Sequence, residues 1–299
     1  MGPGTLAERL ALGPVLLDGA MGTELMRRGL LAGEPPEGWL LTRPHVIFGV
    51  HHRYALAGAE VLYTCTFGAN RLALGRHGLA DRTVAINHKA VEVARMAARE
   101  TGALVFGDLG PTGDLLEPYG DLPPARAREA FAEQATLLMA AGADGLVVES
   151  FADPAEALLA VAAARGAGAR FILATLSFEG PSKHYRTMMG ATPEEAAGAL
   201  AAAGVTALGL NCGTNPSAMV EVARRMRAAV PGTMPIAAKP NAGLPGGPRT
   251  GDAAPEGPEA FAAIARDLAA AGATLIGGCC GTTPAHLAAV RAALAGAHA

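Results

Sequence analysis

Short apolar runs alternate with longer stretches rich in Ala and Leu along most of this chain. The short runs are hydrophobic on both faces, which is typical of strands in a parallel sheet that is covered on both sides. Eight strands are predicted from them: Val15–Asp18, Val61–Cys65, Leu104–Asp108, Gly145–Glu149, Phe171–Thr175, Leu208–Cys212, Ile236–Lys239 and Thr274–Gly278.

Helical patterns fill the intervals between these runs. Apolar residues recur at helical spacing over Thr83–Glu100 and Pro124–Ala141. Later helix starts combine a capping side chain with a following proline, and glycines suited to helix C-termini precede several strands. The capped starts are Asp153-Pro154, Thr192-Pro193, Asn215-Pro216 and Thr283-Pro284, and the glycines are Gly58, Gly102, Gly142, Gly204 and Gly272.

This repeated strand–helix unit predicts an α/β fold, a (βα)8 TIM barrel formed as a single domain by residues 1–299. The length of 299 residues suits such a barrel, which typically needs about 250. A doubly wound open sheet is the alternative, but the glycine-rich segment 18–22 lacks the G-x-G-x-x-G spacing of a dinucleotide loop. The Gly- and Pro-rich segment Leu244–Pro258 is expected to be a long loop after the seventh strand.

Composition narrows the possible partners. The net charge is −3 and no basic cluster is present, so nucleic acid is not an expected partner. No apolar run reaches the roughly 20 residues that cross a bilayer, and the first ten residues lack a signal-peptide core. We therefore expect a cytoplasmic protein without a membrane partner. The run His51-His52-Arg53 is expected to face solvent or the barrel rim.

Polar residues follow the predicted strands where each one ends. Because the active sites of such barrels lie at the carboxyl ends of the strands, we expect these residues to share one site. They are Asp18, Thr64–Asn70, Asp108–Asp114, Glu149, Cys212, Asn241 and the pair Cys279-Cys280.

Cysteines give the sharpest chemical signal. Cys212 ends the sixth predicted strand, and Cys279 and Cys280 follow the eighth, so a barrel brings three thiols together. Neighbouring residues of a strand point to opposite faces, so both members of the pair can reach one metal only if the strand breaks there. The surrounding glycines, Gly277, Gly278 and Gly281, provide that backbone freedom.

Three thiolates with one open position are typical of a catalytic zinc site, whereas structural sites usually have four protein ligands. Zinc deprotonates a thiol that it binds, and three anionic sulfurs keep a fourth thiolate electron-rich, which favours thiol alkylation over hydrolysis. A redox pair or inert core cysteines are the alternatives. Cys65 is either a fourth ligand or a small buried apolar residue.

The same residues resemble the homocysteine S-methyltransferase family over about Leu16 to Ala295. The chain resembles the N-terminal homocysteine-binding module of cobalamin-dependent methionine synthases more than it resembles betaine–homocysteine methyltransferases. The matching segments are 16–25 (LLDGAMGTEL), 66–71 (TFGANR), 107–113 (GDLGPTG), 240–245 (PNAGLP) and 276–284 (IGGCCGTTP).

This resemblance implies a zinc ion on Cys212, Cys279 and Cys280, with homocysteine as the thiol that enters the open position and is methylated to methionine. It also implies that Asp18 and Glu149 hold the substrate ammonium, as two carboxylates at neighbouring strand ends can receive a cation. The backbone N–H groups of Gly19, Ala20, Met21 and Gly22 would suit the substrate carboxylate. Asn211 either orients a ligand by hydrogen bonding or caps its strand.

The methyl donor stays open. No D-x-H-x-x-G cobalamin signature is present, and Cys65 stands where methionine synthases usually carry Asn. Donor candidates are methylcobalamin on a partner protein, 5-methyltetrahydrofolate acting through cobalamin, and a small methylated sulfonium or betaine. The chain is then a methyltransferase, a homocysteine-binding module that needs a cobalamin- or folate-binding protein, or a zinc or redox sensor. Lys239 ends the seventh strand, but without other aldolase features it does not indicate Schiff-base chemistry.

Overall fold

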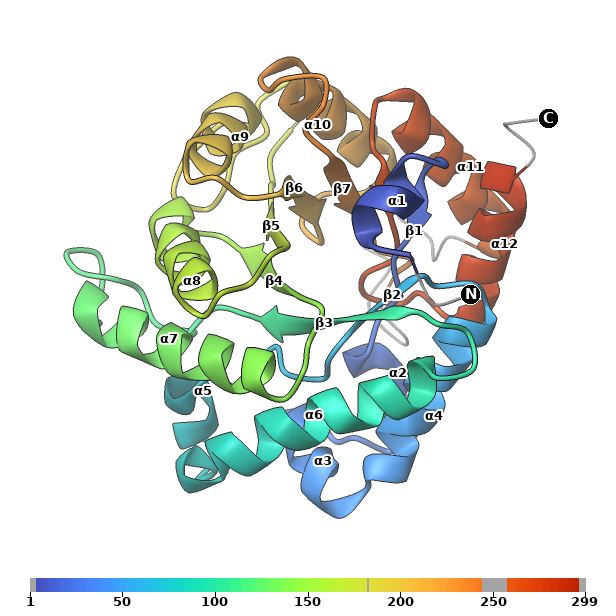
Figure 1. Ribbon diagram of the computed structural model, residues 1–299. Coiled ribbons are helices and arrows are strands. Elements are labelled where there is room, and N and C mark those ends of the chain that lie inside the picture. The colour runs from blue at the N-terminus through green and yellow to red at the C-terminus, as the bar shows by residue number, and fades with distance from the viewer. Residues whose placement is uncertain (1–3, 182, 244–256, 296–299) are drawn as a thin grey trace.

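A computed structural model describes residues 4–181, 183–243 and 257–295, and its strands form a parallel barrel (Figure 1). Each strand pairs with its neighbours in parallel, in the order β1-β8-β7-β6-β5-β4-β3-β2. A parallel bridge between Leu17 and Val61 then joins β1 to β2 and closes the ring. The strands are β1 (Val15–Leu16), β2 (Val61–Tyr63), β3 (Leu104–Leu109), β4 (Gly145–Phe151), β5 (Ile172–Leu176), β6 (Ala207–Asn211), β7 (Ile236–Lys239) and β8 (Leu275–Ile276).

Helices follow the strands and surround the barrel, which confirms the predicted (βα)8 fold. The longer ones are α4 (Pro44–Leu56), α6 (Thr83–Ala98), α7 (Pro124–Ala140), α8 (Pro154–Gly166), α9 (Pro193–Ala202), α10 (Pro216–Ala228), α11 (Pro258–Ala270) and α12 (Pro284–Ala295). Short helices are α1 (Leu6–Leu10), α2 (Gly22–Met26), α3 (Trp39–Thr42) and α5 (Arg71–Gly75), with single 3-10 turns at Pro36–Gly38 and Ala80–Arg82. Of the predicted loop 244–258, residues 244–256 lie outside the described part of the chain.

The predicted helix boundaries have a visible physical cause. Asp153, Thr192 and Asn215 each accept a hydrogen bond from a backbone N–H of the first turn of α8, α9 and α10, respectively. All five predicted terminal glycines have positive φ, between 72° and 108°, which glycine adopts without steric cost. The sequence signals for these helix ends are therefore confirmed.

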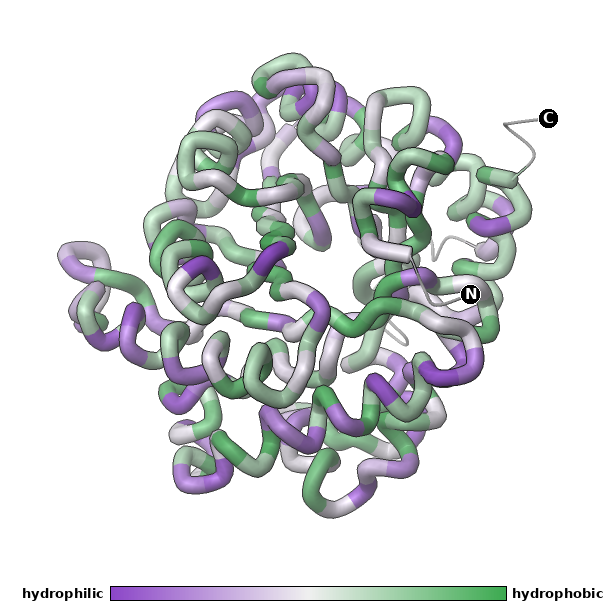
Figure 2. Tube along the Cα trace, viewed as in Figure 1, coloured by the Kyte–Doolittle hydropathy of each residue, from purple (hydrophilic) through white to green (hydrophobic). Residues whose placement is uncertain are grey.

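Two hydrophobic layers hold the barrel together. The outer layer packs helices against strands, and the inner one fills the barrel with side chains such as Val15, Phe106 and Leu275. Leu6 of α1 joins the inner layer, so this helix covers the end of the barrel that faces the viewer in Figure 1. Along the strands the tube in Figure 2 is mostly hydrophobic, as the covered parallel sheet requires.

Side chains alternate between the two faces of each strand, and this alternation places a layer of polar side chains inside the barrel, above the apolar core. Ala237 and Val147 face the barrel interior, so Lys239 and Glu149, two residues further on, face the interior too. The same period places Asp108 above Phe106 and Thr175 above Leu173. The carboxyl-terminal mouth of the barrel is therefore lined by polar side chains, while its middle is filled by apolar ones.

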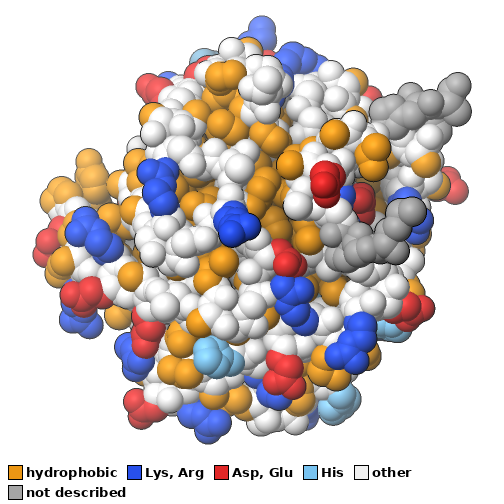
Figure 3. Space-filling model, in the orientation of Figure 1, with side chains coloured by type: hydrophobic (Ala, Val, Ile, Leu, Met, Phe, Trp, Pro, Cys, Tyr) orange, Lys and Arg blue, Asp and Glu red, His pale blue; other side chains and the backbone are white. Residues whose placement is uncertain are grey.

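Charged side chains are dispersed over the face seen in Figure 3, with both signs interspersed around an apolar centre. Within residues 4–181, 183–243 and 257–295, no helix is both long enough and apolar enough to cross a membrane.

One expectation about α4 is wrong. His51 is fully buried rather than exposed at the rim, and neither of its ring nitrogens has a hydrogen-bond partner. Its neighbour His52 stacks on Phe48 and pairs with Glu100 at the surface. Helical geometry turns adjacent residues by about 100°, so one histidine of the pair enters the core and the other does not.

Burial of His51 predicts a pH-dependent stability. Burial lowers the pKa of His51 to about 4, from an ordinary value of 6.5. Above pH 6.5 the residue is neutral in both folded and unfolded chains, so it adds no pH dependence there. Between pH 6.5 and 4 the unfolded chain binds the proton more readily than the folded chain. The free energy of unfolding therefore falls by about 1.4 kcal/mol for each pH unit by which the pH is lowered.

Urea unfolding at pH 7, 6 and 5 tests this expectation on His51→Leu. We expect the variant to lose that part of the pH dependence, whereas the surface change His88→Leu on α6 keeps it. Parallel pH profiles for the wild type and His51→Leu would contradict the assignment.

Candidate active site

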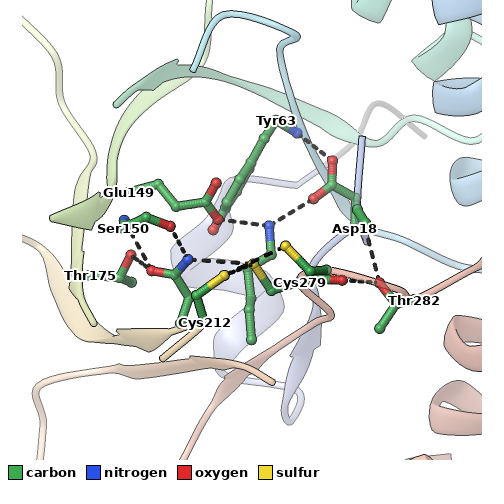
Figure 4. A network of polar contacts seen from close by, with 12 residues as sticks. Asp18, Tyr63, Glu149, Ser150, Thr175, Cys212, Cys279 and Thr282 are labelled. Atoms are coloured by element: carbon green, nitrogen blue, oxygen red, sulfur yellow. Dashed lines mark hydrogen bonds and ion pairs between the residues drawn. The ribbon is translucent and has the colours of Figure 1, made fainter. Parts of the chain in front are cut away.

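Three sulfur atoms converge at the polar mouth of the barrel. The Sγ atom of Cys212 lies 2.8 Å from that of Cys279 and 3.8 Å from that of Cys280. All three atoms lie within 4.8 Å of one another. Cys212 and Cys279 thus come together although they are separated by 67 residues in the sequence, as the barrel predicts for the ends of β6 and β8 (Figure 4).

A break in the backbone aims Cys212 at the other two sulfurs. β6 ends at Asn211, and Cys212 and Gly213 both adopt left-handed conformations, with φ of 54° and 64°. A non-glycine residue in this region costs on the order of 1–3 kcal/mol, so the surrounding contacts must hold it there. The N–H of Cys212 donates to the Lys239 carbonyl at 3.3 Å, which keeps the turn tied to β7.

The Cys279-Cys280 pair lies on a loop that is fixed at both ends. The Cys279 N–H donates to the Pro240 carbonyl, and the Ala242 N–H donates to the Cys280 carbonyl, both at 2.8 Å. Gly281 follows with a φ of 84°, and a Cβ atom added there would lie 1.5 Å from the Gly243 carbonyl oxygen. The predicted strand break is confirmed, and Gly281 is the glycine that the left-handed turn requires.

The three thiols share hydrogen bonds, which separates their acidities. Hydrogen bonds from Cys212 and Cys279 lower the pKa of the Cys280 thiol well below its ordinary value. Hydrogen bonding to Cys279 and then to Cys280 raises the pKa of Cys212. The three thiols therefore titrate as one hydrogen-bonded group and not as independent side chains.

Asn211 contacts this cluster directly. Its Nδ2 atom lies 3.7 Å from the Cys279 sulfur, and its Oδ1 atom accepts from the Ser150 N–H at 3.0 Å and the Thr175 hydroxyl at 2.7 Å. Ser150 has a φ of 62° and lies in a register shift of β4 between Val148 and Phe151. Ser150, which follows Glu149 in the bulge (Figure 4), thus supplies a partner that fixes the Asn211 side chain.

Beside the sulfurs, Lys239 joins two buried carboxylates. Its Nζ atom lies 3.1 Å from Asp18 Oδ1 and 3.0 Å from Glu149 Oε1. The same nitrogen lies 3.7 Å from the centre of the Tyr63 ring. Asp18 follows β1 and Glu149 lies on β4, which are not adjacent in the sheet, so the expectation of neighbouring strand ends is wrong. Lys239, set aside as a Schiff-base candidate, bridges them across the barrel.

The pKa values of Lys239 and the carboxylates around it differ from their ordinary values because the site is buried. Burial raises the pKa of Asp18 to about 6, although Lys239 and the Tyr63 N–H act in the opposite direction. Burial also raises the pKa of Glu149 and, more strongly, that of Asp108. Burial alone would lower the pKa of Lys239, but Glu149 and Asp18 hold it well above 10.5. A buried ammonium is therefore stable here.

The loop after β1 is tied to the cysteine loop. The Ala20 N–H donates to the Thr282 hydroxyl at 3.0 Å, and this hydroxyl donates to the Cys279 carbonyl at 2.7 Å. Tyr54 from α4 donates to the carbonyl oxygens of both Ala20 and Thr282, at 3.0 Å each. Asp18 and Cys279 are consequently held in a fixed relation across the seam between the first and last strands.

A pocket of about 540 Å³ opens over these groups. Of the residues predicted to bind the metal or the substrate, its lining includes all except Asn211, which is buried. Of the other strand-end residues predicted to share the site, Thr64, Phe67, Gly68 and Asp108 line it, whereas Asn70, Asn241 and residues 109–114 do not. Its wall includes Asp18, Gly19, Ala20, Met21, Glu149, Cys212, Cys279 and Cys280, together with Lys239, Tyr63 and Asp108. Sequence reasoning did not select Lys239 or Tyr63 for the site, although their inward positions at strand ends were available as a signal.

Cys65 stands apart from the sulfur cluster. It is 4% exposed, packs in the outer hydrophobic core and is not among the three grouped cysteines. Burial raises the pKa of its thiol well above the ordinary value. Of the two readings of Cys65, the small buried apolar residue is the one that the geometry supports.

The barrel and its three-thiol mouth define the class of protein, and the sequence comparison gives the same answer. Residues 15–294 match the model of the homocysteine S-methyltransferase family, and the chain belongs to that family. It is 35% identical to methionine synthase from Mycobacterium tuberculosis and 34% identical to that from Mycobacterium leprae, in each case over 97% of its own length. The chain spans about a quarter of the length of these relatives, 25% of each.

Solved structures give a second comparison. The homocysteine methyltransferase MmuM from Escherichia coli, in its metallated form, matches with a TM-score of 0.79 and 26% identity. That match covers 96% of this chain and 98% of MmuM. The oxidised form of MmuM matches with a TM-score of 0.75 and 27% identity, over 93% of this chain and 95% of that one.

The geometry at Gly281 makes the cysteine loop sensitive to a single methyl group. We expect Gly281→Ala to lower the free energy of unfolding by more than about 1 kcal/mol, because alanine meets both the left-handed φ and the Gly243 carbonyl. Gly198→Ala in α9 is the matched control, since a Cβ there meets nothing within 4 Å. It should stabilise the chain by about 0.5–1 kcal/mol. Equal urea-unfolding midpoints for the two variants would refute the argument.

Proposed function

We propose that this chain is a zinc-dependent homocysteine S-methyltransferase that forms methionine. The observation that carries the proposal is the convergence of three thiols within 4.8 Å at the mouth of a barrel from this family. Clustered free thiols also fit a reducing compartment such as the cytoplasm.

The sulfur geometry fits a zinc ion. Ligands about 2.3 Å from a tetrahedral zinc lie about 3.8 Å from each other. Cys212 and Cys280 already have this separation of 3.8 Å, whereas the 2.8 Å between Cys212 and Cys279 would have to widen by about 1 Å. Three thiolates would hold the metal and leave one position for a fourth sulfur. When bound, zinc would lower the pKa of an entering thiol and keep it nucleophilic at neutral pH.

One asparagine acts on a ligand sulfur as a donor. The Asn211 Nδ2 atom lies 3.7 Å from the Cys279 sulfur. The Asn241 Oδ1 atom accepts from the Cys212 thiol at 3.4 Å, a contact that only the protonated, metal-free thiol can make. Fixed amides of this kind set the orientation of metal ligands. We assign Asn211 the positioning of Cys279, and the Ser150 and Thr175 contacts hold Asn211 for that task.

The rest of homocysteine would lie across the pocket from the sulfurs. Asp18 and Glu149 are the carboxylates that would receive its ammonium, and the loop Gly19–Met21 would receive its carboxylate through backbone N–H groups. The Ala20 N–H already donates to Thr282, so Ala20 contributes as a wall of the pocket and as an anchor of the loop.

The chemical step is a displacement at the methyl carbon of the donor. The homocysteine thiolate forms the new S–CH3 bond while the bond from the methyl group to the donor breaks. The donor leaves with the bonding electron pair, and the thiol proton goes to solvent when the substrate binds. The rate of methyl transfer is increased by positioning of the two reactants and by activation of the thiolate. No side chain has to transfer a proton during the displacement.

A small free donor is the first choice, because the chain matches 98% of MmuM, which is a homocysteine methyltransferase. The second candidate is a homocysteine-binding module that meets methylcobalamin on a partner protein, because identity reaches 35% with methionine synthases four times as long. The two proposals differ in what the isolated chain does with small donors.

A donor assay separates these candidates. The zinc-loaded chain is incubated with homocysteine and, in parallel, with the methylsulfonium of methionine, betaine or free methylcobalamin, and methionine is quantified. Turnover with a sulfonium or betaine supports the free-donor enzyme. Turnover with methylcobalamin and with no sulfonium or betaine supports the module, and no methionine from any of these free donors argues against the free-donor enzyme.

Zinc-edge X-ray absorption tests the metal site. We expect three sulfurs and one lighter atom in the zinc-loaded chain, changing to four sulfurs when homocysteine is added. Cys212→Ala should lose zinc affinity by more than about 100-fold, whereas Cys65→Ala, the matched control outside the cluster, should keep it. An edge that homocysteine leaves unchanged would favour a zinc or redox sensor instead.

A further inference from the structure

Lys239 places an ammonium group in a cage that has the composition of an ammonium-binding site. The cage consists of Asp18, Glu149 and the face of Tyr63, at 3.1, 3.0 and 3.7 Å from the Lys239 Nζ atom. Asp18 and Lys239 are each 3% exposed, and Glu149 is 9% exposed. Two desolvated carboxylates and an aromatic face are the groups that recognise a cation in a dry site.

This cage belongs to the same pocket as the cysteines. A thiol amino acid bound with its sulfur on the cluster would therefore meet a cage that is already filled by the side chain of the protein itself. Asp18 and Glu149 carry two negative charges and Lys239 carries one positive charge, so the trio presents −1 to a substrate instead of −2. Lys239 also occupies the point between the carboxylates where a second ammonium would make both contacts.

We propose that Lys239 is a specificity-determining residue that competes with the ammonium group of the thiol substrate. The proposal rests on the proposed function and adds the class of acceptor to it. The substrate ammonium reaches Asp18 and Glu149 only by sharing them with Lys239, so that contact adds little affinity. The protein therefore accepts thiol carboxylic acids without an amine nearly as well as the thiol amino acid. Lys239 lowers the affinity for homocysteine and leaves the affinity for its deaminated analogue unchanged.

A purely structural role for Lys239 makes a different prediction. If the lysine only neutralises two buried carboxylates, its removal weakens the whole site, and both kinds of thiol lose affinity together. If it competes, its removal changes the two affinities relative to each other. The ratio of the two affinities therefore distinguishes competition from support.

The experiment compares homocysteine with 4-mercaptobutyrate, which is homocysteine without its ammonium group. Binding of each thiol to the zinc-loaded chain is measured by titration calorimetry, and KM is measured with whichever donor is active. In the wild type the two dissociation constants should agree within about tenfold. In Lys239→Met the constant for homocysteine should fall by about tenfold or more, with that for 4-mercaptobutyrate unchanged or higher.

Lys239→Arg is the matched control, because it keeps a cation beside the two carboxylates and should keep the wild-type ratio. If Lys239→Met does not fold, as judged by circular dichroism and thermal unfolding, the double variant Lys239→Met with Glu149→Gln replaces it. In this double variant the three positions keep a net charge of −1, and the place of the lysine ammonium is empty. The ratio of the two affinities should therefore again shift in favour of homocysteine.

The outcomes separate this proposal from the proposed function. An unchanged ratio, or a loss of homocysteine affinity in Lys239→Met, overturns the competition even if methionine is formed. Binding with the expected shift but no methyl transfer from any donor supports the competition and removes the enzyme proposal. Binding of neither thiol to the wild type overturns both.

Discussion

Closure of the ring of parallel strands is the constraint on which the site depends. The bridge between Leu17 and Val61 joins the first two strands, and β8 then pairs with β1, so the carboxyl end of every strand faces one mouth. Residues distant in sequence meet there because the closed ring gives every strand two neighbours and leaves no edge strand. The sulfur cluster is thus a product of the global fold, since its members come from separate βα units.

Around the cysteine cluster, two residues adopt unfavourable backbone conformations that the closed barrel holds in place. Cys212 adopts a left-handed conformation that a non-glycine residue avoids, and Ser150 does the same opposite Asn211. Unfavourable backbone conformations that gather at one mouth are typical of sites where the orientation of a side chain matters more than local stability. The bulge of β4 and the turn after β6 are therefore joined by the hydrogen bonds between Asn211 and Ser150, and together they orient side chains at the mouth.

Much of this could be predicted from the sequence, for identifiable reasons. Strand positions follow from apolar runs, and helix ends follow from caps such as Asp153 and glycines such as Gly142, because these signals act locally. Convergence of Cys212 with Cys279-Cys280 followed from the strand count. The role of Lys239 did not follow, since an ion pair across the barrel depends on distances between strands that no local pattern encodes. His51 was misassigned for a similar reason: its exposure depends on how α4 is rotated against the barrel.

The tie formed by Tyr54, Ala20 and Thr282 has a consequence for how the protein is made. It fastens the loop after the first strand to the loop after the last, across an interval of more than 200 residues along the chain. The loop that carries Cys279 and Cys280 can therefore be fixed beside Asp18 only after the last βα unit of the barrel has docked. A ribosome-bound intermediate lacking that unit would have Cys212 without its sulfur partners, so competence of the site arises in one late, cooperative event.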